Sequence, residues 1–439
     1  MIGLFVAIAI IIATTYYVMV VKPSSSADKK PQQPEEQKPK QEEVETKKKT
    51  NATKEKKKPA KAPRVHRPKP PSHPRFVRRF GGHSNNITDI ALSPNGEWMA
   101  TAGMDSQIRL SRVEKDHPHE FVQHRIEDHD RVTSLSWEAD GRTVACGTNR
   151  SSEVRFYRVR MKKEAENSSI AKSSDFPYEL VELVKRRFST SSKLDHVSAC
   201  IADHSCSSFH LVFTSGESAA QHGQKVTAAW DGKVGSASHD ALASVKTGGS
   251  GDVRLSQDGK FFCGRGGGSM SEVKLFEVVR KKVKGEIDLH FDKISPKSVM
   301  TLFVNAKVVD VAFLYDNNSR VCDRAVVCTS DGAVQLWSLD VEYRLKEDPK
   351  LLCTTTVDKR IVAIDSSFRT DRFAIVTGDR SLHVFTASSC SASKPFINLD
   401  FTVDECHADG VGDVKICPEG KCVYTRAAAG KDVFAWRAT

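Results

Sequence analysis

The chain has 439 residues, of which 39% are hydrophobic, and its formal net charge is +11. This composition is too apolar for a fully disordered chain, and a mean hydropathy of −0.40 is too polar for a protein with many membrane spans. Eleven cysteines, an odd number without regular spacing, favour a reduced compartment over a disulfide scaffold.

The charge is concentrated close to the N-terminus. Residues 1–21 carry no charged side chain, whereas residues 22–80 hold 19 basic and 7 acidic residues, a net charge of +12. Ten of the 17 prolines also lie in 22–80. Residues 81–439 hold 47 basic and 48 acidic residues, a net charge of −1. The sequence therefore predicts three segments of different character, with bounds 1–21, 22–74 and 75–439.

Residues 1–21 are predicted to form a transmembrane signal-anchor helix. This uncharged, mostly apolar run has about the length of a helix that crosses a hydrocarbon core of ~30 Å. A cleaved signal peptide is the alternative, but no basic residue precedes the run and Val18–Val21 is a poor cleavage site. The lysines that follow place the body in the cytosol by the positive-inside rule. A lumenal body would instead expose N-x-S/T sequons to glycosylation, at Asn51, Asn86, Asn149, Asn167 and Asn317.

Residues 22–74 are predicted to be a disordered linker rich in lysine and proline, with almost nothing to bury. One interpretation is a solvated spacer whose lysines contact anionic lipid. The alternative is a sequence-independent, salt-sensitive attraction to RNA or a ribosome. No aromatic residues are interleaved with the lysines, so a base-stacking surface is not indicated. The densest charge runs comprise Lys47, Lys48, Lys49, Lys56, Lys57 and Lys58.

A repeated pattern begins near residue 81. In its clearest copy, Val326–Trp337, a β-rich run is followed by an Asp-Gly turn, a second alternating strand and a tryptophan. Another copy opens with Gly82-His83 and continues through a Ser-Pro-Asn-Gly hairpin. This is the pattern of WD40 repeats, and it predicts an all-β fold, a seven-bladed WD40 β-propeller over 75–439. The expected ends of the seven third strands are Ser111, Tyr157, Trp230, Phe276, Trp337, Phe385 and Trp436.

The residues characteristic of this repeat are predicted to have a structural role. A turn aspartate can bond to the histidine of Gly-His, and that histidine to a hydroxyl and the tryptophan indole. The best matches are His83, Asp105, Asp331, Trp337 and Trp436. The chain ends just after the third strand of the last blade, so its missing outer strand must come from before the first blade. Residues 75–80 alternate suitably and are predicted to be this closing strand.

The whole architecture resembles the transducin beta-like protein 2 family, which joins an N-terminal anchor, a lysine-rich spacer and a divergent propeller. The most specific match follows Trp337 and contains Asp340, Val341, Glu342, Tyr343, Asp348 and Pro349. The resemblance implies an endoplasmic reticulum membrane protein with a single membrane pass and a cytosolic propeller that binds proteins. It also implies a role in the unfolded-protein response and translation control, with the ER-resident kinase that restrains translation initiation as a partner.

No catalytic, cofactor or metal residues are predicted, and neither is a small-molecule substrate. The Cys417–Cys422 pair lacks the second pair that zinc needs, and Gly264–Gly268 lacks the Gly-Lys-Ser/Thr of a phosphate loop. Gly216–Ala220 approaches a nucleophile elbow but has no α/β sheet around it. We therefore expect a non-enzymatic scaffold. The alternatives are a tether for RNA or a ribosome through the linker, and an ER-bound exchange factor for a small GTPase.

Overall fold

The computed structural model describes residues 71–113, 121–138, 141–151, 153–162, 177–187, 196–200, 211–217, 225–231, 241–245, 253–264, 271–280, 291–295 and 297–439. The chain divides into two units, 1–67 and 68–439, and all the described residues belong to the second. The predicted anchor 1–21 and residues 22–70 of the predicted linker, with the six lysines of its densest charge runs, lie outside the described residues. In the described ranges, no helix has the length and apolar character needed to span a bilayer.

The described strands form seven antiparallel sheets, which we call blades 1–7. Blade 1 contains β2 (Ile87–Leu92), β3 (Trp98–Gly103), β4 (Gln107–Arg112) and β5 (Phe121–Arg125). Blade 2 contains β6 (Val132–Trp137), β7 (Thr143–Thr148), β8 (Glu153–Met161) and β9 (Tyr178–Arg187). Blade 3 contains β10 (His196–Cys200), β11 (Leu211–Glu217), β12 (Lys225–Asp231) and β13 (Ala241–Val245).

The remaining blades follow the same order of strands. Blade 4 contains β14 (Val253–Leu255), β15 (Phe261–Gly264), β16 (Glu272–Arg280), β17 (Phe291–Ile294) and β18 (Met300–Phe303). Blade 5 contains β19 (Val308–Tyr315), β20 (Cys322–Thr329), β21 (Ala333–Ser338) and β22 (Lys350–Thr356). Blade 6 contains β23 (Ile361–Ser366), β24 (Arg372–Thr377), β25 (Leu382–Ala387) and β26 (Ile397–Val403). Blade 7 contains β27 (Val411–Ile416), β28 (Cys422–Ala427), β29 (Val433–Arg437) and β1 (Phe76–Phe80).

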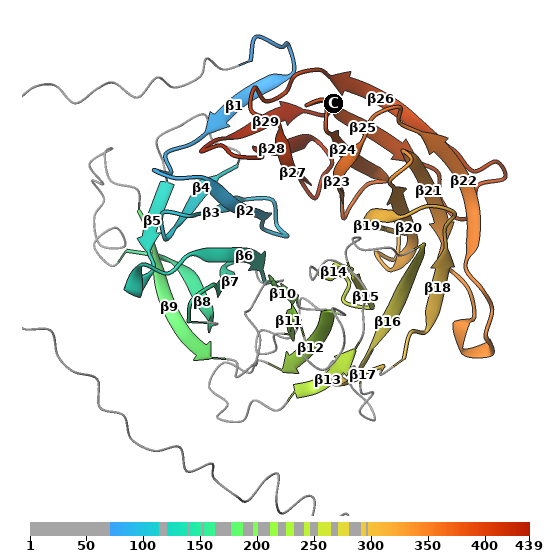
Figure 1. The fold of residues 1–439 in the computed structure, drawn as a ribbon, viewed down its shortest axis with the longest axis horizontal. Helices are drawn as coiled ribbons and strands as arrows, with labels where there is room; N and C mark the ends of the chain where they lie inside the picture. The colour runs from blue at the N-terminus through green and yellow to red at the C-terminus, as the bar shows by residue number, and fades with distance from the viewer. Residues whose placement is uncertain are drawn as a thin grey trace, which may run out of the picture. The chain divides into compact units, whose positions relative to one another are not determined.

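The first strands of the blades lie next to one another in a closed cycle. The neighbours run in the order β2, β6, β10, β14, β19, β23 and β27, and β27 contacts β2 again. Figure 1 shows the blades arranged around a common centre with these strands innermost. All-β blades of this kind, each of four or five antiparallel strands, are like those of a WD40 β-propeller. The seven residues expected at the ends of third strands lie on β4, β8, β12, β16, β21, β25 and β29.

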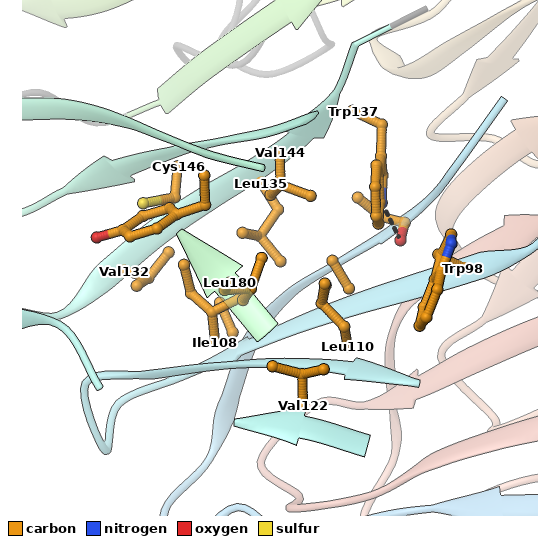
Figure 2. Packing of buried hydrophobic residues seen from close by; sticks show 14 of the residues in the cluster. Trp98, Ile108, Leu110, Val122, Val132, Leu135, Trp137, Val144, Cys146 and Leu180 are labelled. Carbon is orange, nitrogen blue, oxygen red and sulfur yellow. Dashed lines mark hydrogen bonds between the residues drawn. The ribbon is translucent and has the colours of Figure 1, made fainter. Parts of the chain in front are cut away.

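The hydrophobic core lies between blades. One cluster joins Leu110 and Val122 of blade 1 to Leu135, Val144 and Leu180 of blade 2 (Figure 2). Comparable clusters join blades 4 and 5, 5 and 6, 6 and 7, and 7 and 1. Because neighbouring blades cover both faces of a middle strand, all six residues of β3 and of β7 are buried. This burial explains why such strands carry small and β-branched residues on both faces.

The first and last strands of the propeller are joined by backbone hydrogen bonds and side-chain packing. Strand β1 pairs antiparallel with β29, with Phe76 opposite Trp436 and Phe80 opposite Val433. Phe80 also packs against Tyr424 of β28, with the ring centroids 5.9 Å apart. The residues expected to close the propeller, 75–80, thus supply the outer strand of blade 7. A strand that closes the cycle removes an exposed edge that could pair with another chain.

Candidate functional site

Blade 1 holds a buried polar network that links three of its segments. Nδ1 of His83 lies 3.0 Å from Oδ1 of Asp105, and Nε2 lies 2.9 Å from Oγ1 of Thr101. A carboxylate can only accept, so Nδ1 carries the proton and neutral His83 accepts at Nε2 from the Thr101 hydroxyl. Ser111 stands where a tryptophan would complete the network. The network fixes the loop before β2 against β3 and the β3–β4 turn.

The charge states of this network follow from its burial. Burial lowers the pKa of His83 below its usual value, although Asp105 acts in the opposite direction. Burial alone would raise the pKa of Asp105, but hydrogen bonds from His83 and the Ser84 amide outweigh it and lower that pKa. A neutral imidazole therefore donates to an ionised carboxylate. Such an arrangement holds the loop in place and leaves no nucleophile exposed.

Blade 7 contains a second network that the sequence analysis missed. Nε2 of His407 lies 3.0 Å from the Thr425 carbonyl oxygen and 2.9 Å from Thr425 Oγ1. The indole of Trp436 donates to the same Oγ1 at 2.8 Å. Here the histidine carries its proton on Nε2, because a carbonyl oxygen only accepts. His407 lacks a preceding glycine, but it lies 18 residues before its threonine, as His83 does. That spacing could have revealed it.

Blade 5, the clearest repeat in the sequence, has no comparable network. Asp331 is exposed and accepts from Oγ1 of Thr329, 2.5 Å away, within its own turn. The indole of Trp337 donates to Gln335 Oε1, 3.1 Å away on the same strand. The two turn aspartates of the sequence analysis thus have different roles. Asp105 links separate segments, whereas Asp331 stabilises one turn.

This difference predicts unequal effects of two matched substitutions. Asp105→Ala leaves the buried His83 donor unpaired, and we expect a loss of about 1–3 kcal/mol in the free energy of unfolding. Asp331→Ala removes an exposed turn contact, and we expect a loss of about 0.5 kcal/mol. Urea unfolding of both variants measures the contrast. Equal losses would show that the blade 1 network has no special contribution.

His407 makes stability depend on pH. Burial lowers its pKa to about 4, although the Thr425 carbonyl and Asp432 act to raise it. Between pH ~6.5, the unfolded value, and pH about 4, the unfolded chain binds a proton that the folded chain does not. The free energy of unfolding therefore falls as the pH is lowered through this window, by at most about 3 kcal/mol from this group. We expect His407→Gln to flatten the slope, measured by urea unfolding at several pH values. An unchanged slope would contradict the assignment.

Three aspartates occupy one repeated position near the centre, and two of them, Asp89 and Asp310, bond to a neighbouring blade. Asp89, Asp310 and Asp413 are each the third residue of a blade's first strand, just after a register shift. Oδ2 of Asp89 accepts from the Leu135 amide of blade 2 at 2.7 Å. Oδ2 of Asp310 accepts from the Ile364 amide of blade 6 at 3.1 Å. These bonds fix the angle between blades, which packing of apolar side chains alone would leave less defined.

Asp310 has an additional partner in Arg254 of blade 4. Nε of Arg254 lies 3.0 Å from Oδ1, and Nη2 lies 2.7 Å from Oδ2, a two-point contact. Nη2 also donates to the Ile364 carbonyl of blade 6 at 3.2 Å. Burial disfavours the guanidinium charge, but Asp310, then Asp413 and Asp365, raise the pKa of Arg254 above its usual value. One arginine thus connects blades 4, 5 and 6.

The segment that resembles the transducin beta-like protein 2 family folds back onto blade 4. It contains a single 3-10 turn, η2 (Tyr343–Leu345), within the β21–β22 connection. The Tyr343 hydroxyl donates to Oε1 of Glu277 at 2.6 Å, and its ring packs edge-on against Phe261. Glu342, Arg344, Leu345, Asp340 and Asp348 are exposed, Val341 is half-buried and Pro349 is buried. The segment is an ordered surface loop held to the neighbouring blade by Tyr343.

The described residues contain no group of three His, Cys, Asp or Glu side chains placed to hold a metal ion. Large exposed apolar side chains lie on several elements. Phe303 (69% exposed) lies at the end of β18, and Leu345 (76% exposed) lies in η2. The described networks around His83 and His407 connect strands and contain no arrangement aimed at a substrate.

Comparison with known proteins agrees with this architecture. The family model "WD domain, G-beta repeat" matches residues 74–110 and 120–157. Each matched stretch includes one outer strand and the first three strands of the next blade, which is consistent with β1 belonging to blade 7. Among solved structures, a chain from "Crystal Structure of Mitotic Checkpoint Complex" aligns with a TM-score of 0.53. The alignment has 13% identity and covers 87% of this chain and 100% of that chain.

Two curated relatives match over shorter stretches. DDB1- and CUL4-associated factor 13 of Xenopus laevis is 31% identical over 67 residues, 15% of this chain and 15% of that protein. WD repeat-containing protein 36 of Homo sapiens is 49% identical over 35 residues, 8% of this chain and 4% of that protein. The matches thus span well under two thirds of either relative. Together with the blade topology, they show that this chain carries WD40 repeats and folds like a WD40 β-propeller.

Proposed function

We propose that the chain is a membrane-anchored WD40 scaffold that presents its propeller to protein partners. The main observation in support of this proposal is the order of the segments along the chain. An uncharged run of about 20 residues is followed by a basic linker and then by a closed cycle of blades. The predicted linker ends at residue 74 and β1 begins at Phe76, so the chain enters the propeller through its closing strand. WD40 propellers suit protein binding, because many loops from rigid blades converge on their two faces.

A more specific proposal concerns the cellular compartment of the propeller and the protein that it binds. Lysines directly after the apolar run favour a cytosolic propeller, and the resemblance to the transducin beta-like protein 2 family favours the endoplasmic reticulum. On the same basis, the proposed partner is the ER-resident kinase that restrains translation initiation. The scaffold would bring that kinase, or proteins that act with it, to the membrane surface under stress.

Co-purification from stressed cells tests the partner. The full chain is expected to retain the kinase, and a variant that ends at residue 80, which keeps only the predicted anchor, the linker and β1, is expected to lose it. Retention by the shorter variant would show that the propeller is not the binding part. Comparison with Asp331→Ala, an exposed single-turn change, controls for unspecific loss.

A second function, tethering RNA or a ribosome, is favoured by one observation, the +12 charge of residues 22–80. Such binding should weaken steeply between ~50 and ~200 mM salt and disappear when 22–74 is deleted. Ultraviolet crosslinking of the full chain to RNA at both salt concentrations measures it. RNA binding that survives the deletion would rule out the linker as the contact.

A further inference from the structure

The first hairpin of several blades has the same turn. In blade 1, the amide of Ser93 donates to the Trp98 carbonyl at 2.8 Å, and the Gly96 amide donates to the Ser93 carbonyl at 2.9 Å. The Ser93 hydroxyl oxygen then accepts from the Trp98 amide at 2.9 Å. In blade 4, Oγ of Ser256 accepts in the same way from the amide of Phe261 at 2.9 Å. The serine oxygen therefore stabilises the turn as a hydrogen-bond acceptor.

In blade 7 a cysteine occupies the serine position. The amide of Cys417 donates to the Cys422 carbonyl at 2.9 Å, and the Gly420 amide donates to the Cys417 carbonyl at 2.9 Å. Sγ of Cys417 lies 3.1 Å from the amide nitrogens of both Lys421 and Cys422. A thiol sulfur is a weak acceptor. This turn therefore directs two backbone donors at the Cys417 sulfur, where blades 1 and 4 have a serine oxygen.

The residue opposite Cys417 is also a cysteine. The ladder of β27 and β28 pairs Ile416 with Val423, so Cys417 and Cys422 are the next opposed pair. Opposed residues of an antiparallel pair share one face, and their Cα atoms lie ~5.5 Å apart when they are hydrogen-bonded. A disulfide needs a Cα separation of ~4.4–6.8 Å. Trp98 and Phe261 occupy this position in blades 1 and 4.

The surroundings assign different roles to the two thiols. Burial and the neighbouring Cys417 raise the pKa of Cys422, although Arg437 and Arg78 act in the opposite direction. Cys422, which is half-buried, is therefore the sulfur that ionises less readily than a free thiol, whereas Cys417 is the sulfur that two backbone amides contact. Both pack in the cluster that joins blades 7 and 1, together with Phe80 and Tyr424. A bond between them would brace the hairpin beside the closing strand.

We propose that Cys417 and Cys422 form a redox-active dithiol that a hydroperoxide oxidises to a disulfide across the β27–β28 hairpin. In the first step, the Cys417 thiol gives up its proton, its sulfur attacks one peroxide oxygen, and the O–O bond breaks. The sulfur becomes a sulfenic acid, and the departing hydroxide takes up that proton and leaves as water. In the second step, Cys422 sulfur attacks the Cys417 sulfur, loses its proton, and the hydroxyl leaves as water. Two thiols and one hydrogen peroxide thus give one disulfide and two waters.

The test uses the full chain in detergent micelles, treated with hydrogen peroxide and then alkylated with N-ethylmaleimide. Trypsin cuts after Lys415, Lys421 and Arg426, so the two cysteines fall in separate peptides, 416–421 and 422–426. We expect these peptides to appear joined, lighter than their sum by two hydrogens, and to separate on reduction. The thermal midpoint of the oxidised chain should rise by a few degrees over that of the reduced chain.

Three variants control the test. Cys417→Ser keeps an acceptor at the position that Ser93 and Ser256 fill, so it should fold, fail to form the joined peptides and show no thermal shift. Cys422→Ser should leave Cys417 as a sulfenic acid that a dimedone probe traps. Cys353→Ser, a half-buried cysteine on β22, should leave the joined peptides unchanged. Full alkylation of both cysteines after peroxide, or Cys417 joined to any other cysteine, would overturn the proposal.

Discussion

Replacing Arg254 with methionine is expected to lower the free energy of unfolding by about 3–5 kcal/mol. Asp310 is fully buried, and Arg254 contacts it with two nitrogens at 3.0 and 2.7 Å. Methionine keeps much of the volume of the arginine but leaves a buried carboxylate without its positive partner. Removing one member of a buried pair costs more than the pair contributes, because the remaining charge keeps its desolvation penalty. Urea unfolding of the two proteins at pH 7 measures the difference.

Two controls separate the charge pair from general damage to the propeller. The double variant Arg254→Met with Asp310→Asn removes both charges, so it should recover part of the loss. Arg344→Met changes an arginine that is 76% exposed beside Glu277, and it should alter stability by less than about 0.5 kcal/mol. If the double variant is no more stable than Arg254→Met alone, the loss comes from packing and the proposed electrostatic cause is wrong.

Replacing Phe80 with alanine should have an effect of similar size. Phe80 is 8% exposed, lies on the closing strand β1 and packs against Tyr424 in the cluster that joins blades 7 and 1. Truncating a buried phenylalanine costs about 3–5 kcal/mol, because transfer free energy is lost and a cavity remains. Here the loss also weakens the strand that joins the first and last parts of the propeller. We expect a lower urea midpoint and faster proteolysis of the β1 segment.

Val77→Ala is the matched control, because Val77 lies on the same strand but is 45% exposed. It should change the free energy of unfolding by less than about 1 kcal/mol. Equal effects of the two substitutions would mean that the strand contributes through its backbone pairing with β29 rather than through packing of Phe80. Proteolysis that is unchanged in Phe80→Ala would show that the closing strand does not limit opening of the propeller.

The blade pattern could be read from the sequence because it rests on local features. Turn glycines and alternation along strands recur in most repeats, so residues as different as Ser111 and Phe385 can be placed at equivalent positions. The strand that closes the propeller could be predicted from the sequence for a similar reason. A last blade with three consecutive strands needs an outer strand from elsewhere, and 75–80 is an alternating segment just before the first repeat. These features are local in the sequence and can be recognised without knowledge of side-chain geometry.

The polar connections could not be read in the same way. Arg254 and Asp310 belong to different blades, 56 residues apart, and only the folded cycle brings them together. Asp331 matches the repeat better than most turn aspartates, yet among the described residues no histidine bonds to it, whereas His407 bonds to its threonine without the expected glycine. The repeat pattern thus predicts where a residue lies on a blade. Its hydrogen-bond partners depend on the neighbouring segments, which the repeat pattern does not specify.

The most direct test of a membrane-anchored cytosolic scaffold is the topology of the full chain in cells. Microsomes carrying the protein are treated with protease from outside, and glycosylation is assayed by N-glycosidase; the described sequons include Asn86, Asn149 and the exposed Asn317. The proposal predicts a protein that stays with the membrane after alkaline extraction, carries no glycan and loses its propeller to external protease. A protected, glycosylated propeller would reverse the orientation. Release by alkali would contradict the anchor itself.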